Sequence, residues 1–198
     1  MSGSPERAAS RRPGAGPAAG VPHGPAHYLA MLVAAPYLFV GAAPGTGIGV
    51  FTARPVRAGA VLVADEDDTL RGRAMPLAAA LAEGWHRERD LFQLDHDLFL
   101  PPRGCFDDLF NHSCEPSGGW RLTGGGARFL AIRDLAAGDE LTYDYSCHLL
   151  SDDERLECVC GTPSCRGTVG AFGTLPPALQ RRYLRLGVVT PVLARPHA

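Results

Sequence analysis

The chain has 198 residues, of which 45% are hydrophobic, and its formal net charge is -2. This length suffices for one domain with a hydrophobic core. A net charge so close to zero provides no overall basic field, so we expect no direct binding to nucleic acid and no association with an anionic membrane. All 19 basic residues are arginine, and the absence of lysine indicates a bias in composition.

The first part of the chain is rich in Ser, Pro, Gly, Ala and Arg, which predicts a disordered tail over residues 1–27. An uncharged run follows at 28–43, and with Arg11 and Arg12 ahead of it the segment resembles an export signal. Pro36 interrupts the run, which is also too short to span a bilayer. We therefore expect buried strands with a turn there, in a cytoplasmic protein; an organellar transit peptide stays open as an alternative.

Glycine and proline turns separate short β-type runs in 37–68. Within them, "GTGIG" at 45–49 resembles part of a dinucleotide-binding fingerprint, but Val50 stands where that fingerprint needs a glycine, and strand-like residues follow instead of a helix. A P-loop is excluded because the chain has no lysine. Two interpretations remain: a glycine-rich turn, or a backbone that passes close to a ligand.

The middle of the chain contains the clearest helical pattern, because Leu77, Leu81 and Trp85 recur at four-residue spacing within 71–95. Two strands are expected in 127–146, joined by a turn that contains Gly138. These elements predict a mainly β chain (β-rich α+β) with short helices and many turns.

A short helix is predicted near the C-terminus. Thr174 can cap it, Pro176 suits its first turn, and Gly187 can end it. Its apolar stripe consists of Leu175, Leu179 and Leu186.

Three cysteines, Cys158, Cys160 and Cys165, fall within the eight residues "CVCGTPSC". Such a tight C-x-C-x4-C turn brings thiolates together, as tetrahedral zinc requires. The fourth ligand must come from elsewhere, and the candidates are Cys105, Cys114, Cys147 and the histidines. A disulfide or buried free thiols are the alternatives, and the lack of a convincing export signal disfavours a disulfide.

Two tyrosines and one histidine stand in motifs that have ordinary structural interpretations as well as chemical ones. Tyr143 and Tyr145 are two apart in a predicted strand, so both point to one face. Core aromatics are the simpler interpretation and catalytic groups the alternative. His112 alone is more typical of a structural histidine than of a base, and the nearby Cys114 leaves a thiol nucleophile as a further alternative.

Four segments then occur in a fixed order: "GIGVFTARPVRAG", "NHSCEPS", "AIRDLAAGDELTYDY" and "CVCGTPSCRGTVG". Together they resemble a SET-domain protein of the lysine methyltransferase family with a post-SET zinc loop, similar to the small stand-alone SET proteins of bacteria. The resemblance implies a SET fold of several small sheets, with a knot-like crossing of the Asn-His-Ser-Cys segment and the last tyrosine strand. It divides the chain into a SET domain (28–150), a post-SET zinc-binding loop (151–172), and a C-terminal helix and tail (173–198).

The resemblance also implies S-adenosylmethionine (SAM) as methyl donor and a lysine of a protein or peptide as acceptor. By position, Tyr145 would be the catalytic tyrosine, and Tyr143 would set how many methyl groups are added. The residues that would contact the cofactor are Gly47, Ile48, Gly49, Asn111, His112 and Phe172. Structural zinc would be bound by Cys114, Cys158, Cys160 and Cys165.

The predicted function is therefore that of a SAM-dependent protein-lysine N-methyltransferase in which a tyrosine at position 143 favours mono-methylation. Two alternatives are a SET-fold protein that acts on a small molecule and a non-catalytic, zinc-stabilised interaction module. The chain departs from the family pattern at Ser117, where asparagine is usual, at Asp108-Leu109 in place of Arg-Phe, and at Ile48 in place of an aromatic residue. Because Ser117 can still form hydrogen bonds in a turn, we expect the local fold to survive.

Overall fold

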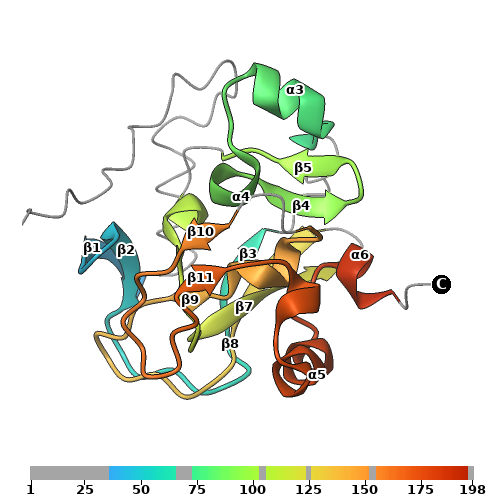
Figure 1. Cartoon of the computed structure of the whole chain (residues 1–198). Coiled ribbons are helices and arrows are strands. Elements are labelled where there is room, and N and C mark those ends of the chain that lie inside the picture. Colours follow the sequence, from blue (N-terminus) through green and yellow to red (C-terminus); the bar gives the residue numbers. More distant parts are fainter. Residues whose placement is uncertain (1–35, 66–72, 103–105, 124–125, 152–154, 196–198) are drawn as a thin grey trace, which may run out of the picture.

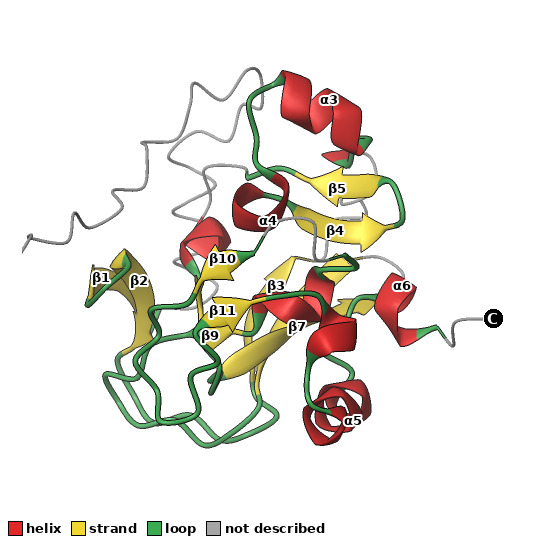
Figure 2. Ribbon diagram, viewed as in Figure 1, coloured by secondary structure: helices red, strands yellow, loops and turns green. Residues whose placement is uncertain are grey.

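Short strands and turns dominate the computed structural model, which describes residues 36–65, 73–102, 106–123, 126–151 and 155–195 (Figure 1). The tail predicted for 1–27 and the first part of the apolar run lie outside the described residues. Within the described part, one three-stranded sheet and four two-stranded sheets form. Figure 2 shows short helices around these small sheets. The prediction of a mainly β chain with short helices is confirmed.

The strands are β1 (Leu38–Ala43), β2 (Gly47–Thr52), β3 (Val61–Asp65), β4 (Phe92–Asp95), β5 (Leu98–Leu100), β6 (Asn111–His112), β7 (Gly118–Thr123), β8 (Gly126–Ala131), β9 (Thr142–Tyr143), β10 (Leu156–Glu157) and β11 (Thr168–Val169). The α-helices are α3 (Leu77–Ala82), α4 (Arg87–Asp90), α5 (Pro177–Leu186) and α6 (Pro191–Ala194). Three 3-10 helices complete the set: η1 (Phe106–Leu109), η2 (Tyr145–His148) and η3 (Phe172–Thr174).

The central sheet has the strand order β3-β8-β7, and both of its pairings are antiparallel. Phe129 of β8 is fully buried and packs against Phe110 and Trp120, with ring centroids 4.5 and 5.2 Å away. Gly118 has to be glycine, because a Cβ there would collide with the Phe129 ring. The main core thus lies against the segment that ends at Phe110, immediately before the Asn-His-Ser-Cys motif.

The β1–β2 hairpin only partly matches the buried strands predicted for the apolar run. Leu38 and Ala43 are buried, but Phe39 and Val40 are each 44% exposed. The hairpin is a two-stranded sheet, and its second strand also bonds to the 139–141 segment through the Leu141 amide and the Val50 carbonyl. Part of an apolar run can therefore lie at the surface.

The single helical stretch predicted for 71–95 is wrong. Helix α3 spans six residues and is followed by Gly84, which has a φ of 88° and ends the helical path. After the four-residue helix α4, the chain becomes strand β4, which pairs with β5. Leu77 and Trp85 pack against the buried Ala80, Leu91 and Phe99, but Leu81 is 50% exposed, so the four-residue spacing marked a buried face only in part.

The C-terminal helix α5 ends at Gly187 as predicted, with a φ of 66°. Its predicted cap is wrong: the hydroxyl of Thr174 donates to the Ala171 carbonyl at 2.8 Å and closes η3 instead. Pro176 occupies the cap position, and no side chain caps the helix. Within the part of the chain that the structure describes, no helix combines the length and apolar character needed to cross a membrane.

The second strand predicted in 127–146 is shorter than expected. Strand β9 contains only Thr142 and Tyr143, and the chain then turns into η2, because the carboxylate of Asp144 accepts a hydrogen bond from the Ser146 amide. Strand β9 runs parallel to β6, so that Asn111 pairs with Thr142. The motif segments 111–112 and 142–143 are thereby brought side by side.

Candidate active site and thiol cluster

Four cysteines converge where the two motif segments meet. The sulfur atoms of Cys114, Cys158, Cys160 and Cys165 all lie within 4.8 Å of one another. The Sγ of Cys158 is 3.7 Å from that of Cys114 and 3.6 Å from that of Cys165. A zinc ion with four Zn–S bonds of about 2.3 Å places its sulfurs about 3.8 Å apart. The set of thiols therefore has the composition and the spacing of a structural zinc site.

Hydrogen-bond donors surround these sulfurs. The backbone amide of Arg166 lies 3.4 Å from the Sγ of Cys114, and that of Gly167 lies 3.5 Å from the Sγ of Cys165. Burial raises the pKa of the Cys114 thiol, so a thiolate at this position needs a cation to stabilise it. Amide donors around metal thiolates serve the same purpose. Of the other candidate ligands, Cys147 is buried in a different cluster, and Cys105 lies outside the described residues.

Asn111 connects the β1–β2 hairpin to the place where β6 and β9 pair, which we call the β6–β9 crossing. Its side-chain amide donates to the Ile48 carbonyl at 2.8 Å and to the Glu140 carboxylate at 2.7 Å. A Cβ at Gly49 would lie 2.9 Å from the amide nitrogen of Asn111 and would collide with Glu140. The need for glycine at position 49 is thus explained by the packing of these two side chains. Asn111 is 2% exposed, and its amide fixes strand β2 against β6.

His112 connects the thiol cluster to the tyrosine segment. Its Nδ1 accepts a hydrogen bond from the Tyr145 amide at 3.2 Å, so the proton of the neutral ring resides on Nε2, which lies 3.5 Å from the Sγ of Cys114. Burial lowers the pKa of His112 to about 4. The positive charge of Arg166 also lowers this pKa, and the negative charge of Asp144 partly offsets the effect. The neutral ring therefore donates to a sulfur on one side and accepts from the catalytic-tyrosine candidate on the other.

The two tyrosine rings are in contact, with centroids 4.7 Å apart. The prediction that both tyrosines lie on one face of a strand is wrong, because Tyr143 belongs to β9 whereas Tyr145 begins η2. The hydroxyl of Tyr145 donates to the Phe110 carbonyl at 2.8 Å, and its ring meets His112 edge-on with a centroid distance of 5.4 Å. The contact between the rings therefore comes from the turn at Asp144.

The remaining predicted cofactor residues lie in different environments. Gly47 has a φ of 94°, and a Cβ there would meet no atom of the described residues within 4 Å. Ile48 is 44% exposed. Phe172 is 5% exposed and packs in a second core cluster with Cys147 and Tyr183. The contact of Phe172 with an adenine ring stays a prediction.

The departure from the family pattern at Ser117 is accommodated as expected. Ser117 is 1% exposed, and its hydroxyl accepts a hydrogen bond from the Thr142 amide at 2.8 Å. Its own amide donates to the hydroxyl of Thr142 at 3.2 Å. These bonds hold β9 in place beside the Asn-His-Ser-Cys segment.

A buried ionic network beside the site was missed by the sequence analysis. The carboxylate of Asp144 is fully buried and accepts from the Arg166 guanidinium at 2.8 Å and from the Tyr183 hydroxyl at 3.1 Å. Burial, together with Asp144, raises the pKa of Tyr183, so this hydroxyl remains a donor. Arg166 directly follows the ligand candidate Cys165. The sequence offered two signals of this network: Asp144 stands between the two tyrosines, and Arg166 follows the last cysteine.

Removing the charge of Asp144 is expected to destabilise the fold. In Asp144→Asn, the Arg166 guanidinium, whose side chain is 19% exposed, loses its fully buried anionic partner, and breaking such a largely buried pair costs about 3–5 kcal/mol. We expect urea denaturation to show a loss of this size. The exposed ion pair of Arg57 and Asp134 provides the control, and Asp134→Asn should leave the urea midpoint unchanged. Equal midpoints for both variants would contradict the role assigned to the network.

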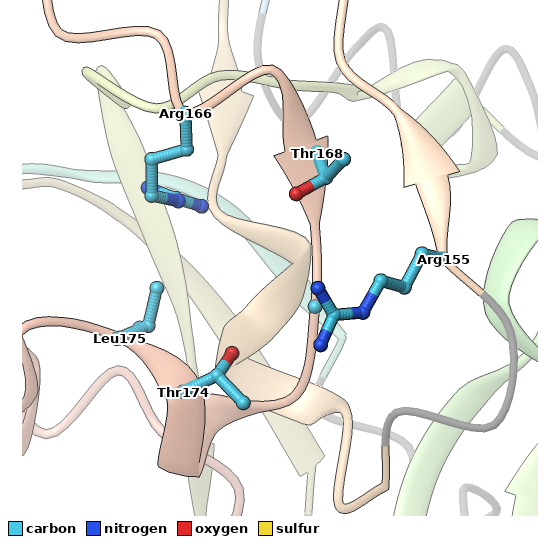
Figure 3. A pocket seen from close by; sticks show the side chains of 6 residues that line it. Arg155, Arg166, Thr168, Thr174 and Leu175 are labelled. Atoms are coloured by element: carbon cyan, nitrogen blue, oxygen red, sulfur yellow. The ribbon is translucent and has the colours of Figure 1, made fainter.

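A cavity of about 180 Å³ lies beside this network (Figure 3). Its lining residues are Arg155, Arg166, Thr168, Gly170, Thr174 and Leu175. None of these is a predicted cofactor residue, and the volume is below the roughly 300–1,000 Å³ of ordinary ligand pockets. The cavity is therefore not assigned to the cofactor.

Comparison with known families accounts for the arrangement of the motifs. The family model described as SET domain matches residues 47–146, which is just over half of the chain. The chain belongs to the SET-domain family. The match contains the predicted residues from Gly47 to Tyr145, and the cysteines at 158–165 follow it.

Among the relatives of this SET-domain chain, "Histone-lysine N-methyltransferase, H3 lysine-4 specific" from Eremothecium gossypii is 40% identical over 84 residues, which cover 39% of this chain and 9% of the relative. "Histone-lysine N-methyltransferase ATX2" from Arabidopsis thaliana is 33% identical over 138 residues, or 62% of this chain and 12% of the relative. The chain therefore spans about a tenth of the length of these relatives.

A solved structure supports the SET fold independently. The structure titled "crystal structure of KRYPTONITE in complex with mCHG DNA and SAH" aligns with a TM-score of 0.50 and 21% sequence identity. The alignment covers 67% of this chain and 28% of the other chain. At this identity the likeness shows the fold alone.

Proposed function

We propose that this SET domain is a SAM-dependent protein-lysine N-methyltransferase. The observation that carries the proposal is the convergence of Tyr143, Tyr145 and the Asn111-His112 segment at the β6–β9 crossing, next to the thiol cluster. The family match and the names of the histone-lysine methyltransferase relatives support the same activity.

The surface near Gly47 is suited to hold SAM. Among the residues that the structure describes, none lies within 4 Å of the position that a Cβ of Gly47 would take. Two apolar side chains, Ile48 and Val159, are 44% and 52% exposed, and the turn at Gly45 approaches the Val159 carbonyl. Exposed apolar groups next to open backbone can take up an adenosyl group. We propose that this surface, together with Asn111 and His112, binds the cofactor.

Methyl transfer needs a neutral, aligned amine. When bound, SAM supplies a methyl group on a sulfonium: the amine lone pair forms the new C–N bond while the C–S bond breaks, S-adenosylhomocysteine leaves, and the product ammonium releases its proton to solvent. A positive sulfonium beside the amine would disfavour the ammonium form, and the rings of Tyr143 and Tyr145 restrict the direction from which the amine approaches. The hydroxyl of Tyr145 donates to the Phe110 carbonyl, which fixes the position of its oxygen beside the Tyr143 ring, where it orients the reacting groups.

We further propose that zinc binds the four cysteines and holds the loop 151–172, as a post-SET segment, against the cofactor surface. The support lies in the contacts of the Asn-His-Ser-Cys segment, on one side with the tyrosine segment and on the other with that loop, whose Arg166 amide lies 3.4 Å from the Sγ of Cys114. His112 lies between the Cys114 sulfur and the Tyr145 amide. Glu115 accepts hydrogen bonds from the amide and hydroxyl of Ser164, at 3.0 and 2.6 Å. The metal would thus stabilise the binding surface and take no part in the chemistry.

The activity is tested by transfer of labelled methyl groups from SAM to recombinant histone H3 and to a lysate of the source cells. The chain has no lysine of its own, so label found on lysine belongs to the acceptor. Calorimetry with SAM separates the proposal from a non-catalytic interaction module, which would give no binding heat. If SAM binds but no protein acceptor is labelled, a small-molecule acceptor is favoured instead.

Tyr143 is proposed to limit the reaction to mono-methylation. Its ring lies 4.7 Å from that of Tyr145, so a hydroxyl at this position crowds the amine or holds a water beside it. We expect Tyr143→Phe to shift the products toward di- and trimethyl-lysine, by about tenfold in the ratio of higher to single methylation, as mass spectrometry of the acceptor would show. An unchanged product ratio would contradict this role.

A further inference from the structure

His148 is a buried histidine that no step above uses. It is the last residue of η2 and is 4% exposed. Its ring lies 4.5 Å from that of Phe92, 5.6 Å from that of Tyr143 and 5.7 Å from that of Tyr145, measured between centroids. The imidazole is therefore part of the same aromatic cluster as both tyrosines of the site.

Neither ring nitrogen of His148 has a hydrogen-bond partner among the residues that the structure describes. The adjacent backbone is well bonded: the Cys147 amide donates to the Asp144 carbonyl at 3.0 Å, and the Leu150 amide donates to the Gln93 side chain at 3.0 Å. A buried polar group without a partner destabilises a fold, and an apolar residue of similar size would avoid the loss. The unsatisfied imidazole thus points to a ligand group that enters the cluster.

The chemistry of the ring indicates what that group must be. Burial, with a smaller effect of His112, lowers the pKa of His148 to about 3, so the ring is neutral, with one N–H donor and one acceptor nitrogen. The faces of neighbouring aromatic rings can receive the N–H weakly, but they repel the lone pair of the other nitrogen. A hydrogen-bond donor is therefore the missing partner.

We propose that His148 binds the acceptor side chain, its unprotonated ring nitrogen accepting a hydrogen bond from an N–H of the amine that lies against Tyr143 and Tyr145. This inference rests on the proposed methyltransferase function. A neutral primary amine has two N–H groups, and each added methyl group removes one. A neutral dimethylamine has none, so His148 selects acceptors that carry no or one methyl group.

The test compares wild type with His148→Leu on histone H3 N-terminal peptides that carry unmethylated, monomethylated or dimethylated lysine. Leucine has a volume close to that of histidine and needs no hydrogen bond. We expect the KM of His148→Leu for the unmethylated peptide to rise about tenfold, and its preference for this peptide over the dimethylated one to fall. The melting temperature should stay equal or rise, since an unsatisfied polar group is removed.

Two amide variants provide the rescue. The side-chain oxygen of His148→Asn can replace Nδ1, and that of His148→Gln can replace Nε2. Recovery of the low KM by either one supports the proposal and identifies the accepting nitrogen. A methylating His148→Leu enzyme with unchanged KM and preference would overturn it, and so would a His148→Leu chain that unfolds, because the imidazole would then be required by the fold itself. If wild type neither binds SAM nor methylates any peptide, the proposed function fails and this inference fails with it.

Discussion

Tyr145→Phe is expected to lower kcat for methyl transfer by about 10²- to 10³-fold, the usual effect of removing one group that orients the transition state. The hydroxyl of Tyr145 donates a hydrogen bond to the Phe110 carbonyl, and the loss of this bond should cost the fold about 1 kcal/mol. The ring contacts with Tyr143 and His112 remain in the variant. The measurement is the single-turnover rate from labelled SAM to an acceptor protein.

The matched control for this variant is Tyr37→Phe. The ring of Tyr37 receives the guanidinium of Arg54 at 3.8 Å and packs at the edge of the main core. Removing the hydroxyl of Tyr37 should leave the rate of methyl transfer unchanged. Equal rates for wild type and Tyr145→Phe, in chains that both bind SAM, would show that Tyr145 is not the catalytic residue.

Loss of zinc is expected to have the largest effect on stability. Cys114→Ser replaces one thiolate of the four, so the zinc content should fall from about one ion per chain to a small fraction. The binding free energy of structural zinc contributes directly to folding, and we expect the midpoint of thermal unfolding to fall by about 10–20 °C. Metal analysis and thermal unfolding, each with and without a chelator, provide the measurements.

Cys147→Ala is the control for the zinc site, because Cys147 is also buried but packs beside Phe172 and Tyr183, away from the thiol cluster. It should keep its zinc and remain sensitive to the chelator. A wild-type chain that contains no zinc after preparation with the metal, or whose melting temperature is unaffected by the chelator, would contradict the assignment.

Features that depend on local chemistry were predictable from the sequence. A cluster of thiols at short spacing is required by a tetrahedral metal site, and three of its four members lie within eight residues. The glycine that ends α5 was also predicted, since a left-handed residue is needed there. The family resemblance then supplied Cys114, which lies close to the other three sulfurs.

Features that depend on distant partners were not predictable. Strand β4 replaces the end of the expected helix because it forms a hairpin with β5, whose Phe99 in turn bridges to Met75, 24 residues away, and this pairing outweighs helical spacing. Asp144 is 22 residues from Arg166 and 39 residues from Tyr183, so its burial with these partners has no local signal. The burial of His148 without a hydrogen-bond partner among the described residues also has no local signal, because it depends on Phe92, 56 residues earlier in the chain, whose ring packs against the imidazole.

The parallel pairing of β6 with β9 has a consequence for the order of folding. Parallel strands cannot be joined by a tight turn, and here the β7–β8 hairpin lies between them in the chain. Local hairpins close at lower entropic cost than distant pairings, so we expect the β7–β8 hairpin to form before the β6–β9 crossing does. The thiol cluster closes later still, because its last member is Cys165. We therefore expect the site to be completed after this hairpin has formed, and substitutions in the site to change the rate of unfolding more than the rate of folding.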